Sequence, residues 1–332
     1  MSILLSICIP TYNRENYLKQ LLDNILKQLN DLKNYEIEIC ISDNASTDNT
    51  KELVFEYKSK YSRITYFRWD RNMGADANYL KVIEIASGEY CWFLGSDDLI
   101  VPDAIVIILS KIKENNDIYL VNRIICDINM NPIKRTPILK ENIDTKKFHF
   151  GTYEKIENYL KSIKEFTGIF SYLSSIVFRK KQWDDMPFNK KFLGTAYAHS
   201  YILLSMFKKN ITLRYVDEYL VLNRGSNDSF SSDGVIKRIK LDFDGFKTLF
   251  LEIFDKKYKL ERYYINLLKQ HYKYRELLII LINSSSEDRT IFFRSIKGIY
   301  NIFLFKIVVA VILFTRFLYR KTFKNLISVK KT

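Results

Sequence analysis

The segment from residue 3 to residue 14 reads ILLSICIPTYNR, an apolar run that stops at a proline and passes into polar residues. Residues 14–30 then repeat leucine and isoleucine at the spacing of one helical face. A short apolar run bounded by proline is typical of a buried strand, and the repeat after it is typical of an amphipathic helix. We therefore predict a strand at 3–9 followed by a helix at 14–30.

The same alternation of strand and helix continues through the first 125 residues. Apolar runs on both faces of successive strands, joined by helices, are typical of a parallel sheet covered on both sides. We expect an α/β fold with a Rossmann-like, mostly parallel sheet. No GxGxxG follows the first strand, which argues against an NAD-binding domain. The further predicted strands are 37–41, 64–69, 90–94 and 118–125, and the helices between them are 48–60, 75–86 and 102–114.

The pattern changes after residue 126. Residues 174–179 predict a strand, 199–208 a short helix, and 212–222 one or two strands that end in a polar loop at 223–228. Long amphipathic patterns then predict helices at 235–256 and 258–283. We divide the chain into a first half of the sheet domain at 1–125, a second half at 126–232, a helical extension at 233–288 and a basic apolar tail at 289–332.

The charge of the chain is concentrated in the tail. The formal net charge is +14, and residues 289–332 hold ten Lys or Arg and no Asp or Glu, so residues 1–288 carry only +4 (14 − 10). The basic residues alternate with aromatic and aliphatic ones, a pattern that favours an anionic membrane surface over nucleic acid. The apolar run 302–314 contains Lys306, so we expect this segment to lie in the interface; a membrane-spanning helix and a buried packing helix are the alternatives.

Cysteine usage and the N-terminal segment both indicate a reducing compartment. None of the four cysteines has the spacing of a zinc site, and we expect buried, reduced thiols. The first ten residues lack a basic region and a cleavage site for secretion. Together with the tail, this predicts a peripheral or monotopic protein at the cytoplasmic face of the inner membrane. The cysteines are Cys8, Cys40, Cys91 and Cys126.

Polar loops follow three of the predicted strands, and in parallel sheets ligands bind at the carboxyl ends of the strands. The loops are Pro10–Arg14, Asp43–Asp48 and Gly95–Asp98. Adjacent carboxylates at a strand end, Asp97 and Asp98, suit a divalent cation that neutralises a diphosphate, although Asp98 could instead cap the helix at Pro102. Asp43 could bind a base or ribose, while one of Ser46, Thr47 or Asp48 caps the next helix.

Four ordered blocks resemble family 2 glycosyltransferases, strongly over residues 3–125 and weakly over 170–228. They read SICIPTYNRENYL, EICISDNASTDNT, RNMGADANYLKVIEIASGEYCWFLGSDD and YLSSIVFRKKQW. The resemblance implies a GT-A fold and a hexosyltransferase-type enzyme that transfers a sugar with inversion from a nucleotide-sugar donor. It implies Mg²⁺ or Mn²⁺ bound at Asp97, although Gly95 stands where the family has the first Asp of its DxD motif. The implied donor-binding residues are Pro10, Thr11, Asn13, Arg14, Asp43, Asn44, Ser46, Asn72, Gly74, Ser96, Asp97 and Arg224.

The general base is the least determined part of this assignment. The family places an Asp or Glu at the start of a helix after the SSIVFR-like strand, where this chain has GTAYAHS at residues 194–200. His199 could be the base, a metal ligand or a structural residue, and Asp98 is the other candidate catalytic residue. Arg224 lies in a loop that resembles abequosyltransferase-like enzymes of surface-polysaccharide assembly, and it could clamp the leaving diphosphate or lie in an ordinary turn. The QxxRW motif of processive synthases is absent, so one sugar is expected per encounter.

Two functional hypotheses follow. The first is a membrane-associated enzyme that adds one sugar to a lipid-linked oligosaccharide of a bacterial surface polysaccharide, such as O-antigen or capsule. The second is a catalytically inactive nucleotide-sugar-binding scaffold at the membrane, supported by Gly95 and by the missing acidic base. Nucleic-acid binding has only the net charge in its favour, and we expect none.

Overall fold

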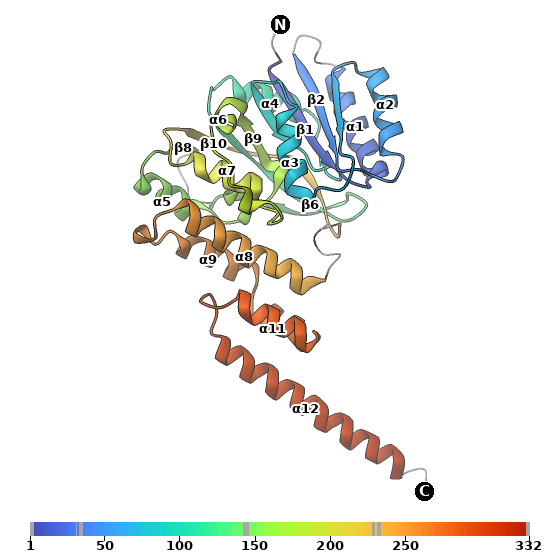
Figure 1. Ribbon diagram of the computed structural model, residues 1–332, viewed down its shortest axis with the longest axis vertical. Helices are drawn as coiled ribbons and strands as arrows, with labels where there is room; N and C mark the ends of the chain where they lie inside the picture. The colour runs from blue at the N-terminus through green and yellow to red at the C-terminus, as the bar shows by residue number, and fades with distance from the viewer. Residues whose placement is uncertain are drawn as a thin grey trace. The chain divides into compact units, whose positions relative to one another are not determined.

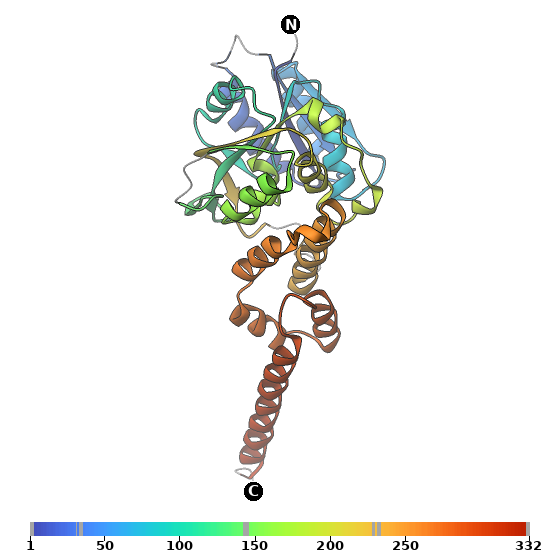
Figure 2. The same cartoon turned by 90° about the vertical axis from the view of Figure 1, so that its left-hand side faces the viewer.

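The computed structural model describes residues 3–30, 32, 36–141, 146–227, 230 and 234–329, with side chains described up to residue 315. It contains two compact units (Figures 1 and 2). The first comprises Met1–Asp228 together with Leu251–Leu260, and the second comprises Ser229–Phe250 together with Glu261–Thr332. The predicted loop end at Asp228 and the basic side chains beyond residue 315 lie outside the described residues.

The first unit is built on one mixed sheet, shown in Figure 1. The strand order is β3-β2-β1-β4-β9-β6-β10-β5, with β7 beside β6 and β8 beside β10. Strands β1 to β4 pair in parallel, as do β6 and β10, whereas β9 runs antiparallel to both β4 and β6. The strands are β1 (Leu5–Thr11), β2 (Ile37–Asp43), β3 (Ile64–Arg68), β4 (Tyr90–Phe93), β5 (Leu99–Ile100), β6 (Ile118–Cys126), β7 (Pro132–Thr136), β8 (Lys147–His149), β9 (Ile176–Arg179) and β10 (Thr212–Arg224).

Helices cover both faces of this sheet, as predicted. Helices α1, α2 and α4 share one apolar cluster with the alternate side chains Leu5, Ile7 and Ile9 of β1, while α3 packs against β1, β2 and α7. All residues of β1 and β2 are buried, which is why both strands appear as nearly continuous apolar runs in the sequence. The helices are α1 (Glu15–Leu29), α2 (Thr50–Lys60), α3 (Ala75–Glu84), α4 (Ala104–Ile112), α5 (Tyr153–Ser162), α6 (Lys180–Asp184) and α7 (Ala198–Met206).

Several details of the sequence prediction need correction. Strand β10 does not end at residue 222 but continues to Arg224, so Asn223 and Arg224 belong to the sheet and not to a loop. Short 3-10 turns, η1 (Phe166–Ile169), η2 (Leu173–Ser175) and η3 (Lys190–Phe192), were not predicted. The predicted helix at 235–256 ends earlier, as α8 (Val235–Ile253), and is followed by the turn η5 (Lys256–Tyr258).

The predicted helix at 258–283 is two helices, α9 (Glu261–His271) and α10 (Tyr274–Ile282). Lys273 between them has an extended backbone with ψ of 142°. The Tyr272 hydroxyl donates to Asp242 of α8, and the Tyr272 carbonyl accepts from the Tyr300 hydroxyl at 2.6 Å. These contacts hold the break in a segment whose local sequence pattern is uniformly helical.

The second unit ends in α11 (Ser286–Ser295) and the long helix α12 (Ile302–Val329), which Figure 2 shows as continuous. Phe305 and Val309 of α12 are buried, and the Phe305 ring contacts Tyr274. Another stripe of α12 leaves large apolar side chains exposed, namely Phe303, Leu304, Ile307, Val311 and Phe314. Among the described residues, no helix is both long enough and apolar enough to cross a bilayer.

Candidate active site

The loops after β1 and β2 meet at the carboxyl edge of the sheet. The Asn44 amide donates to the Thr11 carbonyl at 3.0 Å, and the Asn13 amide donates to the Ser46 hydroxyl at 2.9 Å. Asn13 has φ of 50°, a left-handed conformation that asparagine adopts more readily than most residues. Its side-chain oxygen accepts from the Thr47 amide at 2.7 Å. The structure therefore brings the predicted residues of these two loops together.

Asp43 is fully buried at the end of β2 and shapes this edge from within. Its Oδ1 accepts from the Ser46 amide at 2.8 Å, and its Oδ2 accepts from the Tyr66 hydroxyl at 2.8 Å and lies 3.5 Å from Arg68 Nε. Burial and the bond to Asp43 raise the pKa of Tyr66, so this hydroxyl stays a donor at neutral pH. Both oxygens of Asp43 thus have protein partners.

Asn44, Asn72 and Gly74 form one hydrogen-bonded group beside the N-terminus of α3. Asn44 Nδ2 donates to Asn72 Oδ1 at 2.8 Å, and the same oxygen accepts from the Gly74 amide at 2.9 Å. Gly74 has φ of +85°, and within the described part of the chain a Cβ added here would meet no atom closer than 4 Å. Backbone conformation, and not lack of space, therefore explains a glycine here.

Asp97 lies where the loops after β1, β4 and β10 meet. Arg14 Nη1 is 2.5 Å from Asp97 Oδ1, and Asn227 Nδ2 donates to Asp97 Oδ2 at 2.7 Å. Arg14 Nη2 also donates to the Asn227 carbonyl at 3.1 Å, which closes the group of three. The side chains of Arg14 and Asp97 are 17% and 14% exposed, so the ion pair is accessible at its edge.

Asp98 faces the interior, in contrast to its neighbour. Its Oδ2 accepts from the Tyr172 hydroxyl at 2.6 Å and the Ser174 hydroxyl at 2.5 Å, and its Oδ1 accepts from Asn223 Nδ2 and the Arg224 amide, both at 3.2 Å. Burial, together with the nearby charge of Asp97, raises the pKa of Asp98 from 3.8 to about 6. This geometry makes Asp98 the centre of a hydrogen-bonded cluster that joins β4, η2 and β10.

That cluster also explains Gly95. A Cβ on residue 95 would lie 2.9 Å from Asp98 Oδ2 and 3.3 Å from Asp97 Oδ1. The Gly95 amide donates to the Ser174 hydroxyl at 2.8 Å. The space that a first carboxylate of a DxD motif would need is therefore occupied by the inward-turned Asp98. Tyr172 and Ser174 were not among the predicted site residues, although both lie in the YLSSIVFR block that supports the resemblance.

Arg224 at the end of β10 contacts three parts of the site. Its Nε donates to the Asp97 carbonyl at 2.8 Å, its Nη1 to the Ile128 carbonyl at 2.6 Å and its Nη2 to Gln20 Oε1 at 2.7 Å. The guanidinium carbon also lies 4.6 Å from the centre of the Tyr17 ring. Arg224 is buried and holds the main chain at Asp97 in place.

His199 lies in the first turn of α7 and is buried. Its Nε2 is 2.8 Å from the Phe170 carbonyl, and burial lowers the pKa of His199 to about 4. Within the described residues, Nδ1 has no hydrogen-bond partner. Of the three roles considered from the sequence, this environment agrees best with the structural one, because a buried histidine with a pKa of about 4 is a weak base and is shielded from an acceptor hydroxyl.

Asp76 of α3 is a further buried residue that sequence reasoning missed. Its Oδ2 accepts from the Ala196 amide at 2.8 Å and its Oδ1 from the Ala198 amide at 3.0 Å. Burial raises the pKa of Asp76, and these backbone hydrogen bonds oppose that effect. Asp76 therefore fixes the loop that precedes α7. The signal that could have found it is an acidic residue in the first turn of α3, two residues after Gly74.

Among the described residues, the carboxylate that is accessible where the loops after β1, β4 and β10 meet is that of Asp97. The carboxylate of Asp98 already accepts four hydrogen bonds from other residues of the protein. In the described part of the chain, no group of three or more His, Cys, Asp or Glu side chains is arranged to bind a metal. Magnesium ions are commonly bound by one or two carboxylates together with substrate phosphates. Asp97 therefore fits a cation only if the phosphates of a ligand supply further oxygens.

The remaining predicted residues also lie at this edge. Pro10 and Thr11 pair with Ser42 and Asp43 at the carboxyl ends of β1 and β2. Thr11 Oγ1 is buried and has no hydrogen-bond partner in the described part of the protein. Ser96 is buried in the loop after β4.

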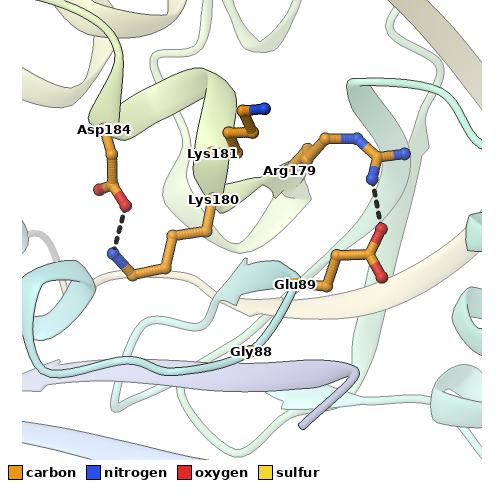
Figure 3. A pocket seen from close by; sticks show the side chains of 6 residues that line it. All are labelled: Gly88, Glu89, Arg179, Lys180, Lys181 and Asp184. Carbon is orange, nitrogen blue, oxygen red and sulfur yellow. Dashed lines mark hydrogen bonds and ion pairs between the residues drawn. The ribbon is translucent and has the colours of Figure 1, made fainter. Parts of the chain in front are cut away.

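A separate shallow pocket of about 470 Å³ opens at the opposite end of β4 (Figure 3). Gly88 and Glu89 precede that strand, and the rest of the lining comes from Arg179 and α6. Figure 3 shows Arg179 paired with Glu89, and Lys180 paired with Asp184. The distance between Lys180 Nζ and Asp184 Oδ2 is 2.6 Å. Because Asp97 follows β4, this pocket lies away from the candidate site and contributes nothing to it.

Residues 6–184 match the family Glycosyl transferase family 2. The chain is 36% identical over 291 residues to abequosyltransferase RfbV of Salmonella typhimurium, an alignment that covers 86% of this chain and 87% of that protein. It is 29% identical over 194 residues to the GalNAc(5)-diNAcBac-PP-undecaprenol beta-1,3-glucosyltransferase of Campylobacter jejuni, covering 57% of this chain and 56% of that one.

Solved structures share the fold at low sequence identity. TarS 1-349 of S. aureus in complex with UDP-GlcNAc matches with a TM-score of 0.64 and 17% identity, over 90% of this chain and 80% of that one. Mannosyltransferase PcManGT from Pyrobaculum calidifontis, in complex with GDP-Man and Mn²⁺, matches with a TM-score of 0.51 and 14% identity, over 95% and 88%. The fold is of GT-A type, as expected. The chain belongs to glycosyltransferase family 2, and within that family it is similar to an abequosyltransferase over most of its length.

Proposed function

We propose that this glycosyltransferase moves one sugar, with inversion, from a nucleotide-sugar donor to a hydroxyl of a lipid-linked oligosaccharide in bacterial surface-polysaccharide synthesis. The observation that carries the proposal is the convergence of the loops after β1, β2, β4 and β10 at one edge of the sheet. The lipid-linked acceptor rests on the name of one relative, an undecaprenol-linked glucosyltransferase.

The donor would lie across this edge. Thr11, Asn13 and the group around Asn44 and Asn72 would line the nucleoside side, with Asp43 shaping the turn behind them. The diphosphate would lie nearest Asp97, where Mg²⁺ or Mn²⁺ would be held by that carboxylate and by phosphate oxygens and would supply positive charge to the leaving group. Arg224 would position the Asp97 main chain and would not clamp phosphate itself, because its three guanidinium nitrogens already have partners.

In an inverting transfer the acceptor oxygen attacks the anomeric carbon from the side opposite the leaving diphosphate. The new carbon–oxygen bond forms as the bond to the phosphate oxygen breaks, and a base removes the hydroxyl proton. Neither candidate base is placed at the accessible edge: His199 is buried beside Phe170, and Asp98 accepts four hydrogen bonds. We therefore assign His199 and Asp98 positioning roles and leave the base unassigned.

We further propose that α12 lies in an anionic membrane surface and keeps the enzyme beside its lipid-linked acceptor at the cytoplasmic face. The support is the exposed apolar stripe from Phe303 to Phe314 and the ten basic residues without an acid between residues 289 and 332. Such a helix buries its apolar side chains among the lipid tails while its cations remain near lipid headgroups.

A thermal-shift screen against UDP-, GDP-, CDP- and dTDP-sugars, with and without manganese, tests the donor class. One nucleotide class should raise the melting temperature, because a ligand that binds only the folded state stabilises it by an amount that grows with the ratio of its concentration to its Kd. Transfer assays with a panel of lipid-linked acceptors then test turnover. Donor binding without product across the panel would support the inactive scaffold, and no stabilisation by any nucleotide sugar would refute both.

A further inference from the structure

The ion pair between Arg14 and Asp97 occupies the position at which a diphosphate and a cation would each need a partner. Asn227 donates to the second oxygen of Asp97 through its side chain and accepts from Arg14 through its carbonyl, so this one residue bridges the pair. The charges of Arg14 and Asp97 cancel each other over a distance of 2.5 Å. Both side chains are mostly shielded from water.

Neither ligand gains much by binding here alone. A cation that approaches by itself meets a carboxylate whose charge Arg14 already neutralises, and it must also displace Asn227. A diphosphate that takes Arg14 by itself leaves Asp97 as a shielded carboxylate without its cationic partner, which is costly in a partly buried place. When both ligands arrive, each charged side chain exchanges one opposite charge for another.

We propose that Arg14 exchanges Asp97 for the donor diphosphate, and that this exchange makes a divalent cation bind at Asp97 more tightly when a nucleoside diphosphate is also bound. This inference rests on the proposed donor site. It assigns Arg14 a binding role that couples the two ligands. By thermodynamic linkage, the cation must raise the affinity for the nucleotide by the same factor by which the nucleotide raises the affinity for the cation.

The test measures Mn²⁺ binding by electron paramagnetic resonance, and nucleotide binding by calorimetry, on the full chain. The probes are Mn²⁺ alone and UDP, GDP, CDP and dTDP, each with EDTA or with MnCl₂. For the wild type we expect weak binding of Mn²⁺ alone and a mutual enhancement on the order of tenfold with one nucleotide. In Arg14→Ala, Mn²⁺ alone should bind about tenfold more tightly, and the mutual enhancement should fall to the part that direct contact between the cation and the phosphate oxygens supplies.

Three variants make the result specific. Arg14→Gln keeps hydrogen-bond donors but removes the charge, so it should behave like Arg14→Ala if charge exchange is the cause. The double variant Arg14→Ala with Asp97→Asn should lose the gained Mn²⁺ affinity. Arg63→Ala is the control, because it breaks an ion pair of 2.6 Å with Glu36 at a distant part of the sheet. It should leave the Mn²⁺ affinity and the mutual enhancement at wild-type values.

The outcomes separate this inference from the proposed function. If a nucleotide binds the wild type but Arg14→Ala and Arg14→Gln keep the wild-type Mn²⁺ affinity and enhancement, the exchange is wrong and the donor site stands. If none of the four nucleotides binds the wild type under either condition, the proposed function fails and the exchange fails with it.

Discussion

Two adjacent aspartates at the end of β4 have opposite environments. Asp97 faces the accessible edge and pairs with Arg14, whereas Asp98 turns inward to Tyr172, Ser174 and the end of β10. From the sequence, two carboxylates in a row indicated a cation site but could not divide the roles between them. The division depends on Ser174 and Arg224, which come from other parts of the chain.

Asp97 provides the most direct test of the reaction. Replacing Asp97 with Asn removes the accessible carboxylate beside the proposed diphosphate, and we expect sugar transfer to fall by at least about 100-fold, the usual effect of losing one electrostatic contact to a transition state. Turnover is measured by release of the nucleoside diphosphate. Asp184→Asn, which removes an exposed carboxylate of α6 that pairs with Lys180, should retain full activity. Equal activity of both variants would remove Asp97 from the mechanism.

The raised pKa of Asp98 predicts that the free energy of unfolding depends on pH. Because burial raises its pKa from 3.8 to about 6, the folded state binds this proton more tightly than the unfolded state. The protonated carboxyl therefore contributes on the order of 3 kcal/mol to the free energy of unfolding below about pH 4. This contribution is lost as the pH rises through 6.

Urea unfolding of the wild type and of Asp98→Asn between pH 4 and 7 measures this contribution. The wild type should lose stability relative to the variant as pH rises, since asparagine does not titrate. The variant should also be less stable than the wild type across this pH range. Asparagine has one acceptor oxygen where aspartate has two, so some of the four donors around residue 98 would lose their partner. A difference that does not change with pH would contradict the raised pKa.

At the scale of elements, the position of β10 decides how the site closes. Because this strand continues to Arg224, the turn that follows brings Asn227 onto Asp97. A Cβ on Gly225 would lie 2.4 Å from the Cys126 carbonyl oxygen of β6, and the Gly225 amide donates to that same oxygen at 2.9 Å. The close approach of the two strands therefore requires glycine.

Gly225→Ala should push this turn away from β6. We expect a loss of about 1–3 kcal/mol in the free energy of unfolding, typical of overpacking against atoms that cannot move aside. Urea denaturation checks this, and nucleotide binding should weaken with it. Ser226→Ala, an exposed change in the same turn, should stay within about 0.5 kcal/mol of the wild type. Similar values for both variants would show that the turn adapts.

At the scale of the whole molecule, charge and exposed apolar surface coincide in one helix. Phe303 and Phe314 of α12 are 73% and 61% exposed, and they lie on the same stripe as Ile307 and Val311. This arrangement predicts binding to vesicles of mixed phosphatidylglycerol and phosphatidylcholine.

Phe303→Ser and Phe314→Ser should each weaken vesicle binding by on the order of tenfold, the effect of removing one buried aromatic side chain from the lipid. Sedimentation with vesicles measures it, and binding should decrease with added salt because anionic headgroups contribute. Phe55→Ser is the matched control, since Phe55 of α2 is 54% exposed but belongs to the first unit. Equal loss in all three variants would refute a specific role of α12.

The sequence by itself determined the alternation of strands and helices, the family, and the polar loops at the carboxyl edge of the sheet. These follow from apolar periodicity and from residues that are neighbours in the chain, so a local pattern suffices. Only the tertiary structure decided that Arg14 pairs with Asp97, that Asp76 fixes the loop before α7, that His199 is buried, and that Lys273 interrupts a helix. Each of these depends on packing between segments far apart in the chain, and spacing along the sequence carries no information about which side chains that packing brings into contact.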